Sequence, residues 1–235
     1  MYRTLNADHI VETIALLRTR IEERFSNSGL SKVAAELQHL ADEAVARSTW
    51  MQKPHLPLRL GIWSLLVLLL AVVAAGLISL RVSTEVHTFV ELVQMVESGI
   101  NDLVLISLGI FFLVTLEVRI KRRRALAAIH ELRSLAHIID MHQLTKDPEH
   151  IAVKGPDTKS SPKRAMSNFE LARYLDYCSE MLSMIGKIAA LYGERFDDPV
   201  ALGAVDEIES LTTGLSRKIW QKIMIIHQNA ARPQP

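Results

Sequence analysis

The sequence predicts an all-α integral membrane protein, with a two-helix transmembrane hairpin and a cytoplasmic helical bundle built from both termini. Three observations predict this fold class. Two strongly apolar blocks lie near the middle of the 235-residue chain. The segments on either side of them repeat apolar residues at helical spacing. Glycine is scarce, at 10 residues, while good helix formers such as Ala, Leu and Glu are common.

The first apolar block predicts a membrane span over residues 60–80. No charged residue occurs between Leu60 and Leu80. A helix of this length measures about 30 Å, which is the thickness of a bilayer's hydrocarbon core. A long polar segment precedes the block, so we expect a retained span rather than a cleaved signal peptide.

The second block, from Gly99 to Arg124, predicts a span over about 101–120. Its uncharged centre, Leu103 to Leu116, measures only about 21 Å as a helix. The polar residues at its two ends would then lie at the membrane interfaces. A re-entrant or interfacial segment is the alternative for this block.

Charge predicts the orientation. Positive residues flank the two blocks, and the connector between Val82 and Asp102 contains no Lys or Arg. Positive charge stays on the cytoplasmic side, so both termini are expected there. The short connector favours a bacterial inner membrane. The basic residues expected at the membrane surface are Lys121, Arg122, Arg123 and Arg124.

These expectations divide the chain into three parts. Residues 1–58 form a cytoplasmic helical hairpin. Residues 59–120 form the transmembrane hairpin, with an amphipathic connector over 82–100 outside. Residues 121–235 form a cytoplasmic three-helix region with a loop at 146–166.

Within the cytoplasmic parts, each expected helix has one apolar stripe and a recognisable end. The first runs from about Asp8 to Phe25. Gly29 is expected as a left-handed cap after it, and Ser31 as the N-cap of the second helix. A further helix continues from the second span and stops before Pro148. The last two helices begin at a Ser167–Glu170 capping box and at Asp198–Pro199.

A polar cluster after the second span is the densest set of residue types that often carry out chemistry in proteins. Its histidines and aspartate could bind a metal or place an acid beside an imidazole. The plainer interpretation is a polar flank of the helix, with His137 bonded to Asp140. The cluster consists of His130, His137, Asp140 and His142.

Two further sets lie in the apolar blocks. The polar residues of the second block could line an ion path, although Asp102 suits a helix start and Glu117 can pair with Lys121. Small residues four apart on the first block would allow close helix packing. The two sets are Asp102, Ser107, Thr115 and Glu117, and Ala71, Ala75 and Ser79.

No catalytic or metal-binding motif is present in the sequence, so we expect neither an enzyme nor a cofactor. The formal net charge of +1 gives no reason to expect nucleic acid as a partner. We expect a membrane-anchored scaffold or signalling adaptor, in contact with the lipid bilayer, assembled as a homo-oligomer and able to bind a cytoplasmic protein. The alternative is an oligomeric channel or pore lined by the second span.

Overall fold

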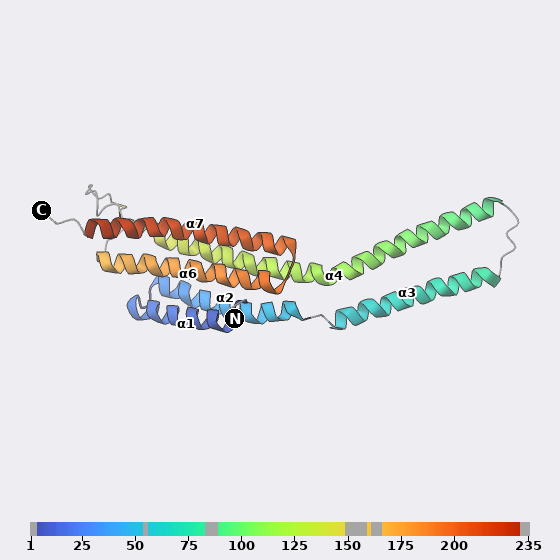
Figure 1. Ribbon diagram of the computed structural model, residues 1–235, viewed down its shortest axis with the longest axis horizontal. Helices are drawn as coiled ribbons and strands as arrows, with labels where there is room; N and C mark the ends of the chain where they lie inside the picture. The colour runs from blue at the N-terminus through green and yellow to red at the C-terminus, as the bar shows by residue number, and fades with distance from the viewer. Residues whose placement is uncertain (1–3, 54–55, 83–88, 149–158, 161–165, 231–235) are drawn as a thin grey trace. The chain divides into compact units, whose positions relative to one another are not determined.

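The computed structural model describes residues 4–53, 56–82, 89–148, 159–160 and 166–230, although the side chains of some helix residues in these ranges are not described. Every regular element in these ranges is an α-helix, which confirms the all-α class (Figure 1). The chain forms two compact units, one of residues 1–52 with 124–235 and one of residues 53–123. The helices are α1 (Ala7–Arg24), α2 (Gly29–Gln52), α3 (Leu56–Val82), α4 (Phe89–Leu144), α6 (Asn168–Arg195) and α7 (Pro199–Ala230).

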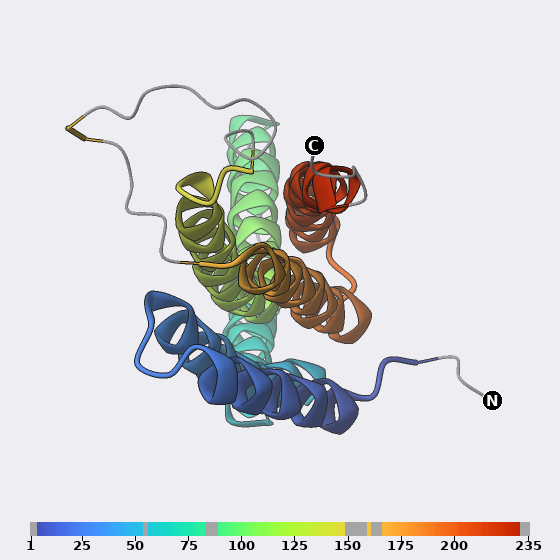
Figure 2. The same cartoon turned by 90° about the vertical axis from the view of Figure 1, so that its left-hand side faces the viewer.

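The first unit is a helical bundle of α1, α2, the second half of α4, α6 and α7. Seen nearly along the helices, α6 lies among the others (Figure 2). The buried face of α6 covers roughly 200° of its circumference, from Leu191 round to Leu175, twice the width of an ordinary amphipathic stripe. A helix with this pattern needs partners on several sides, and α1, α2 and α7 all pack against it.

The predicted apolar stripes form the core of this bundle. Ile14 and Leu17 of α1, Leu37 of α2 and Ile139 of α4 are at most 1% exposed. The predicted stripe of α6 is buried as well, and so is that of α7. Because each helix buries one side against the others, the segments before and after the apolar blocks make a single core.

Two of the predicted helix starts are confirmed in detail. The Ser167 side chain accepts a hydrogen bond from the Glu170 N–H, and the Glu170 carboxylate accepts one from the Ser167 N–H. Asp198 accepts hydrogen bonds from the backbone N–H groups of Val200 and Ala201, each at 3.1 Å. These bonds satisfy donors that have no partner within their own helix.

The turn between α1 and α2 differs from the sequence prediction. The left-handed residue is Asn27, with φ 53°, and Gly29 is the first residue of α2. Ser28, not Ser31, caps the helix, because its hydroxyl accepts a hydrogen bond from the Ser31 N–H at 3.1 Å. Gly29 has a different role: a Cβ there would lie 2.5 Å from Cε1 of His142 in α4. Close packing between helices, rather than backbone conformation, therefore accounts for this glycine.

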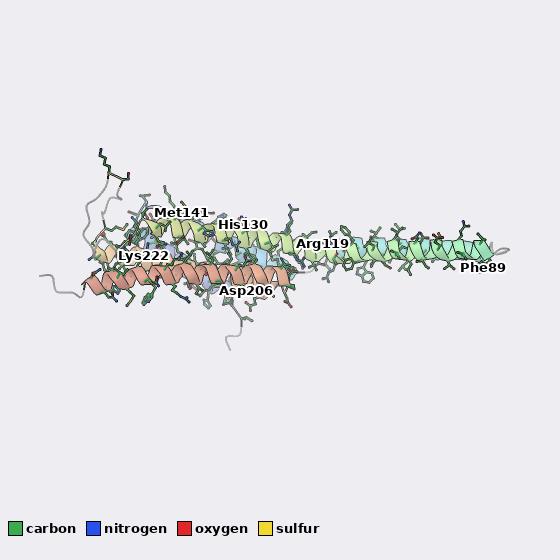
Figure 3. The ribbon with its side chains drawn as sticks, turned by 90° about the horizontal axis from the view of Figure 1, so that it is seen from above. Phe89, Arg119, His130, Met141, Asp206 and Lys222 are labelled. Carbon is green, nitrogen blue, oxygen red and sulfur yellow. The ribbon has the colours of Figure 1, made fainter. Side chains whose placement is uncertain are left out.

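The second unit contains α3 and the first half of α4. Helix α4 is continuous for 56 residues, about 84 Å, and Figure 3 marks Phe89, Arg119, His130 and Met141 along it. The expected connector over 82–100 is therefore not a separate helix in its described part. No proline interrupts α4, and its two glycines, Gly99 and Gly109, each cost only about 1 kcal/mol in a helix, which is too little to end it. The expectation that the second span continues as a helix beyond Arg124 is confirmed.

One helix in the described part of the chain is long and apolar enough to cross a membrane. It lies within Val96–Leu144, and none of its apolar window is buried. A second apolar helix, Arg59–Ala75, is shorter, counting only the residues whose side chains the structure describes. Large side chains on both are exposed, for example Trp63 at 65% and Leu105 at 67%.

Candidate functional site

In the described part of the second unit, the most buried polar side chains lie between α3 and α4. Glu117 of α4 accepts a hydrogen bond from Nε of Arg59 in α3 at 2.9 Å. Its other oxygen lies 2.9 Å from Nζ of Lys121, which also donates to the backbone oxygen of Lys53 at 3.1 Å. We call these four residues, Lys53, Arg59, Glu117 and Lys121, the basal clamp.

The basal clamp ties the start of α3 to α4. The side chains of Glu117 and Lys121 are only 11% and 10% exposed, whereas that of Arg59 is 55% exposed. A carboxylate so little exposed to water requires charged partners, and here it has two. The predicted Glu117–Lys121 pair is thus confirmed. The Arg59 contact was missed, although the two residues border the two apolar blocks, whose ends must meet in an antiparallel hairpin.

The other polar residues of the second apolar block do not converge on one place. Asp102 and Ser107 are exposed, and they lie about 140° apart around α4. The Thr115 hydroxyl donates to the backbone oxygens of Phe111 and Phe112 in its own helix. With Glu117 held in the basal clamp, these four residues have separate surroundings.

The small residues of α3 are not at the described contact between α3 and α4. Ala71 and Ala75 are exposed, and the side chain of Ser79 lies outside the described residues. The two helices instead face each other across a space of about 320 Å³. Its lining residues are Leu65, Leu66, Leu69, Leu105, Ile106 and Gly109.

The four consecutive basic residues after the second block have different surroundings. Lys121 belongs to the basal clamp, and Arg123 is exposed. The guanidinium of Arg124 lies 4.1 Å from the centre of the Trp50 ring in α2. A cation over an indole face is attracted by the ring's electrons, so Arg124 joins α2 to α4 within the bundle.

The predicted polar cluster is dispersed. His130 and His137 are exposed on α4, while His142 contacts Gly29. The expected bond from His137 to Asp140 is not found among the described residues, and Asp140 instead accepts a 2.6 Å hydrogen bond from Gln143. Within the described ranges, no group of three or more His, Cys, Asp or Glu side chains could hold a metal ion.

The single cysteine is a core residue. Cys178 on α6 is fully buried, and this burial raises the pKa of its thiol to about 12. Burial likewise raises the pKa of Tyr192 to about 12. At neutral pH both side chains are therefore neutral packing residues, and the thiol is not a nucleophile.

Comparison with family models, with curated proteins and with solved structures gives no match to this chain.

Proposed function

We propose that the protein is a non-catalytic, membrane-anchored scaffold or signalling adaptor that presents its helical bundle to a cytoplasmic partner. One observation carries this proposal. Every core hydrophobic residue in the described part of the chain belongs to the bundle unit, and none to residues 53–123. The apolar side chains of that second unit need an apolar surrounding, and a lipid bilayer supplies one.

In this proposal, α3 and α4 cross a bacterial inner membrane as a hairpin. Residues 60–80 and about 101–120 form the two spans, and the polar residues around Asp102 lie outside. The basic residues of the basal clamp and of 122–124 lie at the cytoplasmic interface, as the positive-inside rule requires. Both termini, and hence the bundle, are then cytoplasmic. The basal clamp fixes the hairpin where it leaves the membrane.

The scaffold is favoured over an oligomeric pore by the surroundings of the polar residues in α4. A pore needs its polar side chains on one face of the lining helix. Asp102 and Ser107 lie on different sides of α4, Thr115 bonds to its own helix, and Glu117 is paired with two cations. A homo-oligomer remains compatible with the scaffold.

The topology can be tested with single cysteines in a Cys178→Ala background. Glu97→Cys marks the expected outer end of α4, and Glu209→Cys marks the exposed surface of α7. A membrane-impermeant maleimide applied to intact bacterial spheroplasts should label Glu97→Cys at once. It should label Glu209→Cys only after lysis. Labelling of both sites before lysis, or release of the chain by alkaline carbonate, would contradict the proposal.

Ion flux distinguishes the scaffold from the pore. Purified protein in liposomes should give no flux at any potential, and Asp102→Asn should behave in the same way. A flux in the parent protein that Asp102→Asn alters would make the pore the better description.

A further inference from the structure

A long groove runs between α2 and α4 on the surface of the bundle. It consists of two hollows of about 480 and 460 Å³. Arg47 and Glu131 line both hollows, so the hollows adjoin, and the 2.6 Å ion pair between these two residues joins α2 to α4 where the hollows meet. We call the two adjoining hollows the groove.

The groove has the length of a short helix. Its lining extends from Glu36 to Met51 on α2 and from Arg124 to Ile138 on α4, about 22 Å and 21 Å, or four helical turns. On each helix the lining positions recur at intervals of three and four residues, so each helix contributes one face.

One end of the groove is apolar. Its apolar side chains are Ala46, Trp50 and Met51 from α2 and Ala127 from α4. Its charged side chains are Arg124, which lies over the Trp50 ring, and the Arg47–Glu131 pair. This end can take an apolar side chain of a partner but offers little to a polar one.

The other end carries excess negative charge. Glu43 and Glu131 share a single cation, Arg47, with both contacts at 2.6 Å. Glu36 has no ion-pair partner among the described residues, and His39 lies 3.9 Å from Glu43. Three carboxylates therefore face one arginine, and a cation from a partner would reduce the remaining negative charge.

We propose that this groove binds a basic amphipathic helix of the cytoplasmic partner. Apolar side chains of that helix would fill the end at Trp50, and a Lys or Arg would lie beside Glu36 and Glu43. Recognition of an amphipathic helix by a groove between two helices is a common mode of peptide binding. The inference rests on the proposed function, because it names the class of partner that the adaptor would bind.

The test uses the full chain in nanodiscs of phosphatidylcholine, with empty nanodiscs as the blank. The probe is a fluorescent 18-residue helical peptide with leucine on one face and lysine elsewhere, and fluorescence anisotropy gives the Kd. A matched peptide carries glutamate in place of every lysine. The lysine peptide should bind above the blank, and the glutamate peptide should bind at least about tenfold more weakly, because the acidic end repels it.

Two pairs of variants locate the binding. Ala46→Trp fills the apolar end, while Ala35→Trp makes the same change at an exposed position of α2 outside the groove. Glu36→Lys reverses a groove charge, while Glu209→Lys reverses an exposed charge on α7. The two groove variants should each raise the Kd by about tenfold, and the two controls by less than about twofold.

The proposal is overturned if the lysine peptide binds no more than the blank, or if groove and control variants bind it equally. It is also overturned if Ala46→Trp lowers the number of subunits per nanodisc, because a second copy of the chain would then occupy the groove. If the peptide test fails but the cysteine labelling gives the expected topology, only the proposed binding of a helix in the groove is rejected. Peptide binding without that topology rejects the membrane hairpin and leaves the groove.

Discussion

The bundle and the hairpin use similar side chains in opposite surroundings. Leu182 of α6 is 0% exposed and Leu105 of α4 is 67% exposed, yet both lie in the middle of a regular helix. In the bundle, neighbouring helices cover the apolar side chains. In the hairpin, the helices satisfy their own backbone hydrogen bonds and leave the apolar side chains uncovered. Helix formation and core formation are therefore separable, and the described residues of 53–123 form helices without contributing to the hydrophobic core.

The largest difference between the bundle and the hairpin is expected from a matched pair of leucine-to-alanine substitutions. Leu182→Ala should lower the free energy of unfolding by about 2–5 kcal/mol, because it leaves a cavity in a closed core. Leu105→Ala should change it by less than about 0.5 kcal/mol in detergent, where no protein core is disturbed. Labelling of Cys178 measures opening of the bundle, since its buried thiol has its pKa raised to about 12 and does not react while folded. If both variants lost the same free energy of unfolding, Leu105 would contribute as much to stability as the buried Leu182.

Among the described side chains of the hairpin, those of Glu117 and Lys121 in the basal clamp are buried. Glu117→Gln leaves Lys121 without its carboxylate, and we expect the packing of α3 on α4 to weaken by about 3 kcal/mol. Spin labels at Ser64 and Leu108, in a Cys178→Ala background, should show a broadened distance distribution. Glu131→Gln is the control, because that carboxylate is 44% exposed and its ion pair contributes little. If the distance distribution broadened equally in both variants, Glu117 would not hold α3 against α4 as proposed.

Packing at Gly29 should have a smaller effect. Gly29→Ala forces His142 to move, and we expect a loss of about 1–2 kcal/mol in spite of alanine's better helix propensity. Adding His142→Ala should restore stability, because the two side chains no longer collide. Chemical denaturation of the four members of this double-mutant cycle gives the coupling energy. A coupling energy near zero would show that the contact between residue 29 and His142 does not affect stability.

The capping box should give the smallest effect. Ser167→Ala should cost about 1 kcal/mol, while Ser210→Ala on the exposed side of α7 should be neutral. Hydrogen bonds from the Ser167 backbone and side chain lower the pKa of Glu170. The stabilisation from the hydrogen bonds to the Glu170 carboxylate is therefore complete above the ordinary carboxyl pKa of 4.5. It is lost as the pH falls through the lowered pKa of Glu170 in the folded protein. The stability difference between parent and Ser167→Ala should become smaller in acid, where the bond from the Ser167 hydroxyl to the Glu170 carboxylate is lost. It should not vanish, because the Ser167 hydroxyl still accepts a hydrogen bond from the Glu170 N–H. A difference that does not change with pH would contradict this linkage.

Much of the bundle could be predicted from the sequence because its signals are local. The stripe through Ile10, Ile14, Leu17 and Ile21 depends only on helical spacing, and all four residues are buried. The Ser167–Glu170 box needs three residues of separation and no knowledge of the fold. Such short-range patterns identify helices and their starts, and they also show which face each helix buries.

Of the three features that were not predicted, two involve helices far apart in the chain, and one is a choice between local partners. Gly29 fits a helix cap by local rules, but its neighbour His142 lies on α4, so the glycine serves packing. Asp140 was expected to bond to His137, yet Gln143 lies at the same distance along the helix and forms the bond. The groove between α2 and α4 has no sequence motif, because neither helix alone makes it. Tertiary packing decided the first and the third case, whereas the second was a choice between two partners on the same helix, each three residues from Asp140.

The division of the bundle between residues 1–52 and 124–235 has a consequence for biogenesis. Helices α1 and α2 leave the ribosome first, but most of the surface that covers their apolar stripes is made last. About 70 intervening residues take on the order of 4–14 s to synthesise. During that interval the amino-terminal helices are without the later helices that cover their apolar stripes, so those stripes are not yet part of the closed core. Any truncation before α6 would leave a chain whose first two helices lack the helices that close their core.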